Sequence, residues 1–226
     1  MRAALLALLL PLAGCGGMMQ SMMTKSVDQT AGARVLAHSG EHEVKRLDKK
    51  GNTFPVSLKV GESLKTADLI IGSDDEQSML LLMLSESNLA QFNEADFVLR
   101  SPLGEDTDVF MATIEMGRVL LSLKGSPKAQ FNFVDTNKST LTVHASAVLF
   151  MNIDDDGMRV FVKSGAAEIT NSASKLEVKV AAGSGQQINE GKATPWSAPA
   201  DLNWGLEVPS ADAVKDAAKA AVGVTP

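Results

Sequence analysis

Apolar and polar residues alternate in short runs along most of this chain, and this alternation limits the fold more than any other feature. In residues 176–180, for example, Leu, Val and Val alternate with Glu and Lys. Because successive side chains of a β-strand point to opposite faces, such a run directs one set toward a core and the other toward solvent. The same period occurs at 131–133, 141–145 and 158–163. We therefore expect an all-β domain, in which one face is also shared by Phe110, Ala112, Ile114 and Met116.

Turn-forming residues separate the runs, and one run is apolar throughout. Gly, Asn, Asp, Ser and Lys gather at 39–41, 49–52, 61–62 and 72–76. Residues 79–84 read Met-Leu-Leu-Leu-Met-Leu between polar neighbours. A run this short fits a strand buried on both faces better than a helix. Short strands at such spacing are typical of a sandwich, a barrel or a solenoid.

Residues 1–14 have the layout of a secretory signal peptide. Arg2 gives a positive start, residues 3–12 are apolar and rich in leucine, and small residues then lead to Cys15. The apolar stretch is too short to span a membrane, which takes about 20 residues. Cys15 is the only cysteine, so no internal disulfide can form and the domain has to depend on its hydrophobic core.

The sequence Leu12-Ala13-Gly14-Cys15 resembles the lipobox of bacterial lipoproteins. The resemblance implies that the Cys15 thiol is acylated, as with palmitate, and that Cys15 then becomes the N-terminus. One acyl chain binds a membrane reversibly, but lipoproteins of this type carry three, which implies a permanent anchor. Gly16 stands where an aspartate would favour the inner membrane, so we expect the outer membrane, on its periplasmic side. The alternative is an ordinary secreted protein with an unrelated cysteine.

Composition narrows the choice of partner. The net charge of −6, with no dense basic cluster, argues against nucleic acid, whose binders carry basic patches. Tyrosine is absent and aromatic residues make up 4% of the chain. This composition weakens any function that needs stacking platforms for sugars or bases.

The chain divides into four segments: the signal peptide (1–14), an acylated N-terminus with a flexible tether (15–32), the β domain (33–204) and an alanine-rich C-terminal helix with its tail (205–226). Ser210 can cap this helix and Gly223 can end it. A single helix of about a dozen residues is marginal in water. We expect it to dock on the domain or to await a partner, through an apolar stripe of Val214, Ala218, Ala221 and Val222; the alternative is a frayed tail.

A series of short motifs runs in order from residue 36 to residue 188. It comprises a strand ending in a glycine turn (36–44), a leucine-glycine-acid segment (58–70), two strands around a polar turn (78–92), a glycine-led strand (116–121, repeated at 164–169) and a glycine-glutamine phrase (183–188). Over residues 33–204 this order resembles the FecR-type domain, a family found outside the bacterial cytoplasm. The resemblance implies one double-layered β domain, jelly-roll-like or a short β-solenoid, and a sensing or scaffolding role in the envelope.

The chain departs from the family in several places. The usual Gly-Thr pair before a Phe strand is missing at 146–151, and the usual Gly-Asp step is Ala67-Asp68. Well-known members also have an intracellular anti-sigma segment and a transmembrane helix, which relay signals from iron-siderophore receptors of the outer membrane. Neither is found in this sequence, so we do not expect this chain alone to pass a signal across the inner membrane.

Few residues are candidates for a metal or a cofactor, and we expect neither. His38 and His42 flank a turn and His144 is distant in sequence, whereas zinc needs three or four ligands with outer-shell support. We expect surface histidines. Thioethers in the tether could bind Cu(I), but no His or Cys completes that site, so we interpret it as a spacer. The methionines concerned are Met18, Met19, Met22 and Met23.

Catalytic and calcium-binding motifs are also incomplete. Residues 154–157, Asp-Asp-Asp-Gly, lack the downstream glutamate of a calcium loop and are interpreted as a hairpin turn. Residues 73–76 are interpreted in the same way. No Gly-x-Ser-x-Gly elbow occurs, and the Ser-x-x-Lys-like stretch 122–126 lies at a strand end. We therefore expect no enzyme.

Three functions follow from these patterns. The leading hypothesis is a lipoprotein whose FecR-like domain binds, senses or scaffolds another envelope protein. The second is a cell-wall or glycan binder, for which Trp196 and Trp204 are the candidate stacking residues. A small hydrolase is the least supported.

Overall fold

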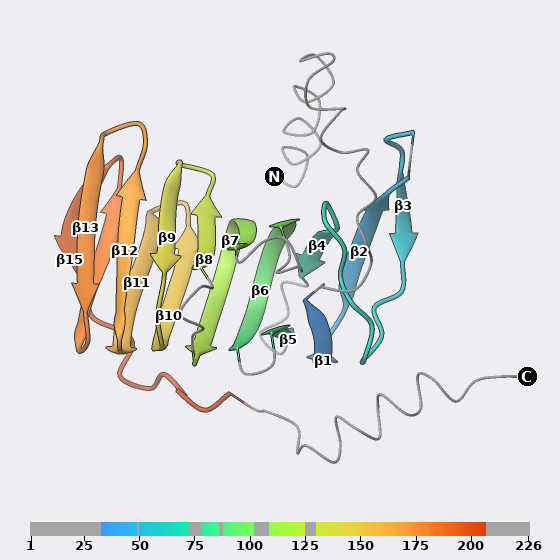
Figure 1. Ribbon diagram of the computed structural model, residues 1–226, viewed down its shortest axis with the longest axis horizontal. Coiled ribbons are helices and arrows are strands. Elements are labelled where there is room, and N and C mark those ends of the chain that lie inside the picture. Colours follow the sequence, from blue (N-terminus) through green and yellow to red (C-terminus); the bar gives the residue numbers. More distant parts are fainter. Residues whose placement is uncertain are drawn as a thin grey trace, which may run out of the picture. The chain divides into compact units, whose positions relative to one another are not determined.

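The computed structural model describes residues 33–48, 50–72, 78–85, 88–101, 109–124 and 130–206, all within the unit 31–226. Across these residues the only regular secondary structure is β, which confirms the all-β prediction (Figure 1). The strands are β1 (Arg34–Ser39), β2 (His42–Leu47), β3 (Thr53–Val56), β4 (Leu69–Gly72), β5 (Met79–Ser85), β6 (Asn88–Ser101), β7 (Val109–Leu123), β8 (Gln130–Asp135), β9 (Ser139–Val143), β10 (Ala147–Asp154), β11 (Gly157–Ser164), β12 (Ala166–Asn171), β13 (Leu176–Ala181), β14 (Ser184–Asn189) and β15 (Lys192–Pro195). The predicted C-terminal helix lies outside the described residues. In the described part of the chain there is no helix with the length and apolarity to cross a membrane.

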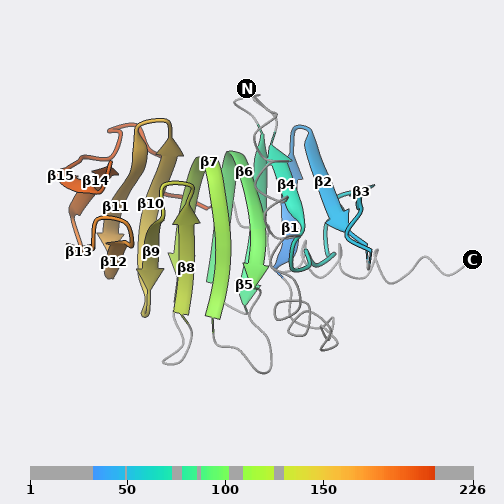
Figure 2. The same cartoon turned by 90° about the horizontal axis from the view of Figure 1, so that it is seen from above.

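The strands form a single sheet that divides at its two longest members, β6 and β7. The second half of β6 pairs with β4 and its first half pairs with β5. Likewise, the first half of β7 pairs with β8 in parallel, and its second half pairs antiparallel with β10. Two layers result. The first layer is β3-β2-β4-β6-β7-β8-β9-β12-β13, and the second layer is β1-β5-β6-β7-β10-β11-β14-β15. Figure 2, turned by 90°, shows the two rows of strands that share β6 and β7.

The core lies between the two layers. Its largest fully buried side chains come from both halves of the divided sheet, with Phe110 and Phe133 in the first layer and Leu82 and Leu121 in the second. Phe92 and Phe97 stack at a ring-centroid distance of 4.2 Å, one on each side of the bend in β6. Burial of such large apolar side chains stabilises by about 1.5–3 kcal/mol each, so this continuous core can hold the domain without a disulfide.

Both long strands change their inward-facing set where they pass from one layer to the other. In β7 the core residues are even-numbered up to Ile114 and odd-numbered from Val119. In β6 the same change follows Phe92, where the pairing register shifts between Asn93 and Asp96. A strict period of two cannot change face, so an extra residue is needed at the bend, as in a β-bulge.

The prediction for Met116 is wrong for this reason. Phe110, Ala112 and Ile114 share the core face as expected, but Met116 is 46% exposed. It directly precedes Gly117, whose φ of +123° marks the bend. Apolar residues occupy every second position from 110 to 116, but Met116 lies where the strand leaves the first layer and so no longer faces the core.

Candidate functional site: the outer face of the second layer

A row of directly opposed residues crosses the outer face of the second layer. On β5, β6, β7, β10 and β11 the neighbours before and after such a residue, for example Leu80 and Leu82 around Leu81, belong to the core, so the row faces away from it. We call this row the outer lane. It consists, in strand order from β1 to β14, of Ala37, Leu81, Gln91, Leu120, Phe150, Phe161 and Gly185.

The outer lane is unusually apolar for the outward face of a sheet. Leu81 is fully buried, and Leu120 and Phe150 are each 5% exposed. The prediction that residues 79–84 form a strand buried on both faces is confirmed, with Met79 and Met83 half-buried beside Leu81. An apolar face of this kind is normally covered by another segment or by a partner, because the removal of apolar surface from water lowers the free energy.

The outer face of the first layer has the opposite character. Asn132, Thr142, Glu168 and Lys179 stand opposite one another across β8, β9, β12 and β13. Asn132 Oδ1 accepts hydrogen bonds from Gln130 Nε2 (2.9 Å) and from the Thr142 hydroxyl (3.0 Å). These polar side chains can remain in contact with water, so the two outer faces differ in chemical character.

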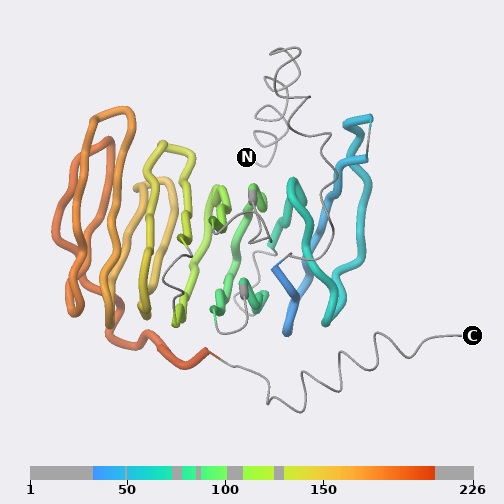
Figure 3. Tube along the Cα trace, in the orientation of Figure 1, coloured from blue at the N-terminus to red at the C-terminus, as the bar shows by residue number. Residues whose placement is uncertain are grey.

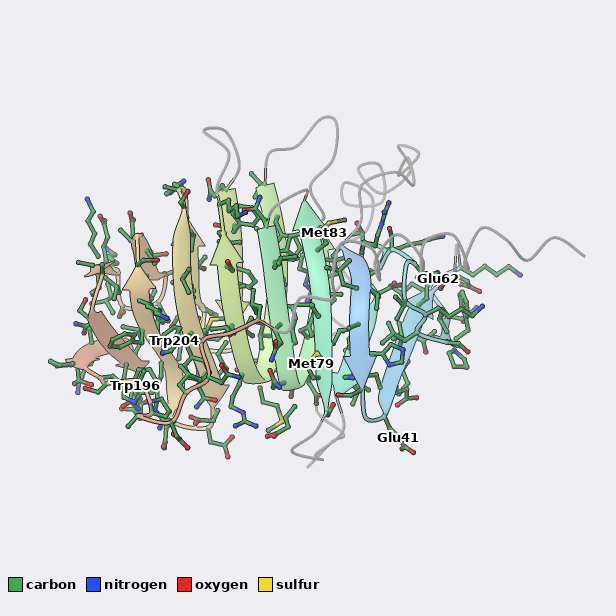
Figure 4. All side chains as sticks on the ribbon, turned by 90° about the horizontal axis from the view of Figure 1, so that it is seen from below. Glu41, Glu62, Met79, Met83, Trp196 and Trp204 are labelled. Atoms are coloured by element: carbon green, nitrogen blue, oxygen red, sulfur yellow. The ribbon has the colours of Figure 1, made fainter. Side chains whose placement is uncertain are left out.

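The segment after β15 returns across the outer lane. Trp196 N donates a hydrogen bond to the Gly185 carbonyl (3.0 Å), and its ring stacks on Phe150 with centroids 6.2 Å apart. Trp204 packs on Phe161 at 5.9 Å. Figure 4 shows both tryptophans on this segment, and in Figure 3 the red end of the described trace runs back beneath the strands.

Gly185 allows this close approach. A Cβ added at Gly185 would lie 2.5 Å from the Trp196 carbonyl oxygen and 2.8 Å from the Val160 carbonyl oxygen. Both distances are far shorter than real Cβ contacts. The glycine of the 183–188 phrase therefore lets the returning segment lie directly on β14.

Charged and polar residues border the outer lane on one side. One step along each strand stand Asn93, Arg118, Asn152, Arg159 and Gln187, again in register. Arg118 forms an ion pair with Glu94, and Arg159 pairs with Asp154 and with Asp156 Oδ2, the latter at 2.7 Å. Above the aromatic end, Lys163 Nζ lies 5.2 Å from the centre of the Trp204 ring. An apolar strip with a polar and charged border is the arrangement typical of a protein-binding surface.

The predicted histidine candidates do not form a metal site in the described residues. His38 and His42 meet edge to face at 6.1 Å, and His144 follows β9 with an exposed side chain. His42 Nε2 lies 3.0 Å from the Ser39 carbonyl and 3.1 Å from the Met79 carbonyl, so it donates its proton to them. Burial, helped by the charge of His42, lowers the pKa of His38. No group of three or more metal-ligating side chains occurs in the described ranges.

The acidic run 154–157 forms the predicted hairpin turn between β10 and β11. Asp154 pairs with Gly157 across the turn, and Gly157 has a φ of +101°. Asp154 and Asp156 bind Arg159 on the following strand, so their charge is used within the hairpin. Cys15, the four tether methionines and residues 73–76 lie outside the described residues.

Sequence reasoning missed Leu120 and Phe150 as outward-facing residues, whereas the alternation at 158–163 had already put Phe161 in the outward set with Arg159 and Lys163. A signal for the two missed residues was present, because 119–121 and 149–151 are apolar without a polar break, like 79–84. Apolar neighbours on one strand point to opposite faces, so one member of each run has to face outward. The predicted stacking residues Trp196 and Trp204 do lie on this face, and each has a ring surface occupied by a phenylalanine.

Comparisons with known proteins find partial structural likeness alone. No family model and no curated protein matches the sequence. The chain is similar to two crystal structures of a proposed anti-sigma factor from Parabacteroides distasonis, at 2.50 Å and 1.65 Å resolution, with TM-scores of 0.44 and 0.43 and identities of 15% and 16%. The matches cover 52% and 51% of this chain, and 55% and 54% of those chains. The chain thus spans about half the length of the structures that it matches.

Proposed function

We propose that this chain is a non-enzymatic, lipid-anchored envelope protein whose FecR-like β domain binds another envelope protein, as a sensing or scaffolding module. Cys15 carries the acyl anchor, and the domain faces the periplasm, on the outer membrane. The order of FecR-like motifs over residues 33–204 and the lipobox at 12–15 support this proposal.

One structural observation carries the binding role: the outer lane already holds polypeptide. The returning segment lies on it through two tryptophans and a backbone hydrogen bond to Gly185. Extended or amphipathic segments of a partner have the chemistry that such a lane accepts, with aromatic and apolar anchors inside a charged border. The outer face of β8, β9, β12 and β13 in the first layer carries the polar row Asn132, Thr142, Glu168 and Lys179 in place of an apolar strip.

Glycan or cell-wall binding is the alternative. It is favoured by the two tryptophans, which are each partly exposed. It is disfavoured by their packing, because Phe150 and Phe161 occupy ring surface that a sugar would need. Sedimentation with purified cell wall separates the two functions: a glycan binder pellets with protein-free cell wall, whereas a protein binder does not.

Photo-crosslinking in intact cells tests the protein-binding role. A photoreactive residue replaces Met83, which lies on the outer face of the second layer (Figure 4). The matched control is Thr142, half-buried on the outer face of the first layer. We expect one discrete partner, from position 83 and not from position 142. The same purified partner should bind the purified domain and lose affinity on Met83→Glu. Equal capture from both positions, or none, contradicts the proposal.

A further inference from the structure

We propose that the C-terminal segment 210–222 docks as a helix on the outer lane between β10 and β1, extending the cover that Trp196 and Trp204 begin. The docked segment occupies the part of the outer lane that the proposed function assigns to a partner, so a partner would bind there by displacing it. The inference rests on the course of the described segment, on the length of the lane beyond it and on the chemistry of both surfaces.

The returning segment keeps one side toward the sheet up to its last described residue. From Leu202 onward the returning segment alternates: Leu202, Trp204 and Leu206 are half-buried, whereas Asn203 and Gly205 are exposed. An extended segment with this alternation lies with one side on the sheet. Among the described residues, its ring contacts with the outer lane are with Phe150 of β10 and Phe161 of β11, so the strands β7, β6, β5 and β1 lie beyond them.

The predicted helix matches the remaining part of the outer lane in length. A helix of residues 211–222 is about 18 Å long at 1.5 Å per residue. Neighbouring strands lie about 4.8 Å apart, so the lane from β10 to β1 measures about 19 Å. Residues 207–210, which can span up to about 13 Å, are sufficient to bring the helix to its start. The helix and the remaining lane have the same length.

The predicted helix and the outer lane also match in their apolar character. Val214, Ala218, Ala221 and Val222 form the apolar stripe of the predicted helix, and the lane offers Leu120 and Leu81. Alanines let a helix approach a sheet closely, while Lys215 and Lys219 stay at the side of the stripe.

Gln91, at the middle of this part of the lane, gives independent support. Its Nε2 donates to Asn93 Oδ1 at 3.0 Å, but its Oε1 is shielded from water and accepts no hydrogen bond within the described residues. Buried side-chain oxygens are almost always paired. A covering segment outside the described residues is the expected source of the shielding and of a donor.

Disulfide trapping tests the docking. Cys15→Ala in the full chain removes the natural cysteine, so an introduced pair is the only one present. The test pair is Gln91→Cys with Ala218→Cys, and the control pair is Thr142→Cys with Ala218→Cys. Positions 91 and 142 are both half-buried and outward-facing, but on different layers. Circular dichroism first establishes that both variants fold.

We expect the 91–218 pair to form an intramolecular disulfide under mild oxidation, at least about tenfold faster than the 142–218 pair, because docking holds the two thiols at high effective concentration. Equal rates overturn the proposal. Covalent dimers whose yield rises with protein concentration also overturn it, because a second copy would then occupy the lane. Hydrogen exchange on the unmodified chain gives a second readout: amides 212–221 should exchange at least about tenfold slower than in an unstructured peptide, and fast exchange contradicts docking.

Discussion

At the scale of single residues, Ala67 occupies a backbone conformation that suits glycine better. Its φ is +67°, in the left-handed region that favours glycine. The contacts of the next residue keep the backbone in this conformation. Asp68 is fully buried and accepts two hydrogen bonds from Arg46, of 2.8 and 2.7 Å, and a third from Lys65 N. The Ala67 and Leu99 backbones are also joined, with Ala67 N donating to the Leu99 carbonyl at 2.7 Å.

Ala67→Gly should therefore stabilise the domain. The left-handed conformation costs an alanine about 1–2 kcal/mol, and the greater freedom of glycine in the unfolded chain offsets about 0.5–1 kcal/mol of that. We expect a net gain of about 0.5–1 kcal/mol, or a melting temperature about 1–4 °C higher. The control Ala181→Gly, at an exposed strand position without positive φ, should lose stability. Thermal melts of both variants measure the difference; a loss at both positions contradicts the interpretation.

Asp135 makes a pH-dependent contribution. Burial raises the pKa of its carboxyl, although hydrogen bonds from Ser139 and Asn137 oppose the shift. Its Oδ2 is buried and has no partner in the described chain, while Oδ1 accepts from Ser139 N at 2.7 Å. The folded state keeps this proton at a pH where the unfolded state has lost it. The contribution to stability is thus complete below the ordinary pKa of 3.8 and is lost as pH rises through the raised value.

Asp135→Asn should remove this loss, because an amide keeps the acceptor for Ser139 N and does not ionise. Relative to the unmodified protein, we expect the variant to gain stability between pH 4 and pH 7, measured by urea unfolding at each pH. Asp48→Asn is a control of opposite sign, since hydrogen bonds from Asn52 lower the pKa of Asp48. Its stability relative to the unmodified protein should fall only as pH rises toward 3.8 and should stay level between pH 4 and pH 7. A parallel response of the two variants would refute the assignment to Asp135.

At the scale of elements, the bend in β6 and β7 organises the fold. Gly117 in β7 faces Ala95 in β6 so closely that an added Cβ would lie 2.4 Å from the Ala95 Cα. Gly165, which leads the repeat of the same motif at 164–169, also has a positive φ, and its added Cβ would lie 2.2 Å from the Ser146 carbonyl oxygen. Both glycine-led motifs therefore mark places where one strand passes close against another backbone.

Gly117→Ala should be among the most damaging substitutions in the domain. It combines the cost of a positive φ, about 1–2 kcal/mol, with a backbone clash of about 1–3 kcal/mol. Gly183→Ala is the matched control, because Gly183 has a φ of +76° but nothing within 4 Å of an added Cβ. We expect a loss of about 1 kcal/mol at Gly183 and of about 3 kcal/mol or more at Gly117, measured by urea unfolding. Similar losses at both would show that the close approach to Ala95 is unimportant.

The inward faces of straight strands could be predicted from the sequence, whereas the bend in β6 and β7 could not. The alternation at 141–143, 158–162 and 176–180 identified strands whose inward faces are as predicted, because a straight strand keeps one face throughout. The bend was not visible, because β6 and β7 change face through bulges and through pairing with residues distant in sequence. The outer lane was hidden for a related reason: no local pattern says which strands lie side by side, so Leu120 and Phe150 could not be placed on one surface.

At the scale of the whole molecule, the two outer faces of the domain differ in polarity. The first layer presents polar rungs such as Asn132 and Thr142, and the second presents the apolar outer lane. Under the proposed function, the second face would bind the partner while the polar first face stays in water. This division is a consequence of strand order, which places β5, β7 and β10 within one layer.

The last prediction concerns the anchor on which this arrangement depends. Cys15→Ala removes the thiol that the lipobox resemblance implies is acylated, so the chain should lose its acyl label and move from the membrane fraction to the soluble fraction. Three acyl chains bury many methylene groups at about 0.8 kcal/mol each, which no tether of this composition can replace. Met18→Ala, in the same segment but outside the lipobox, is the matched control and should keep both label and membrane retention. Fractionation of intact cells after labelling with a palmitate analogue measures both properties. Retention of unlabelled Cys15→Ala in the membrane pellet would show that the chain is held by something other than a lipid on Cys15.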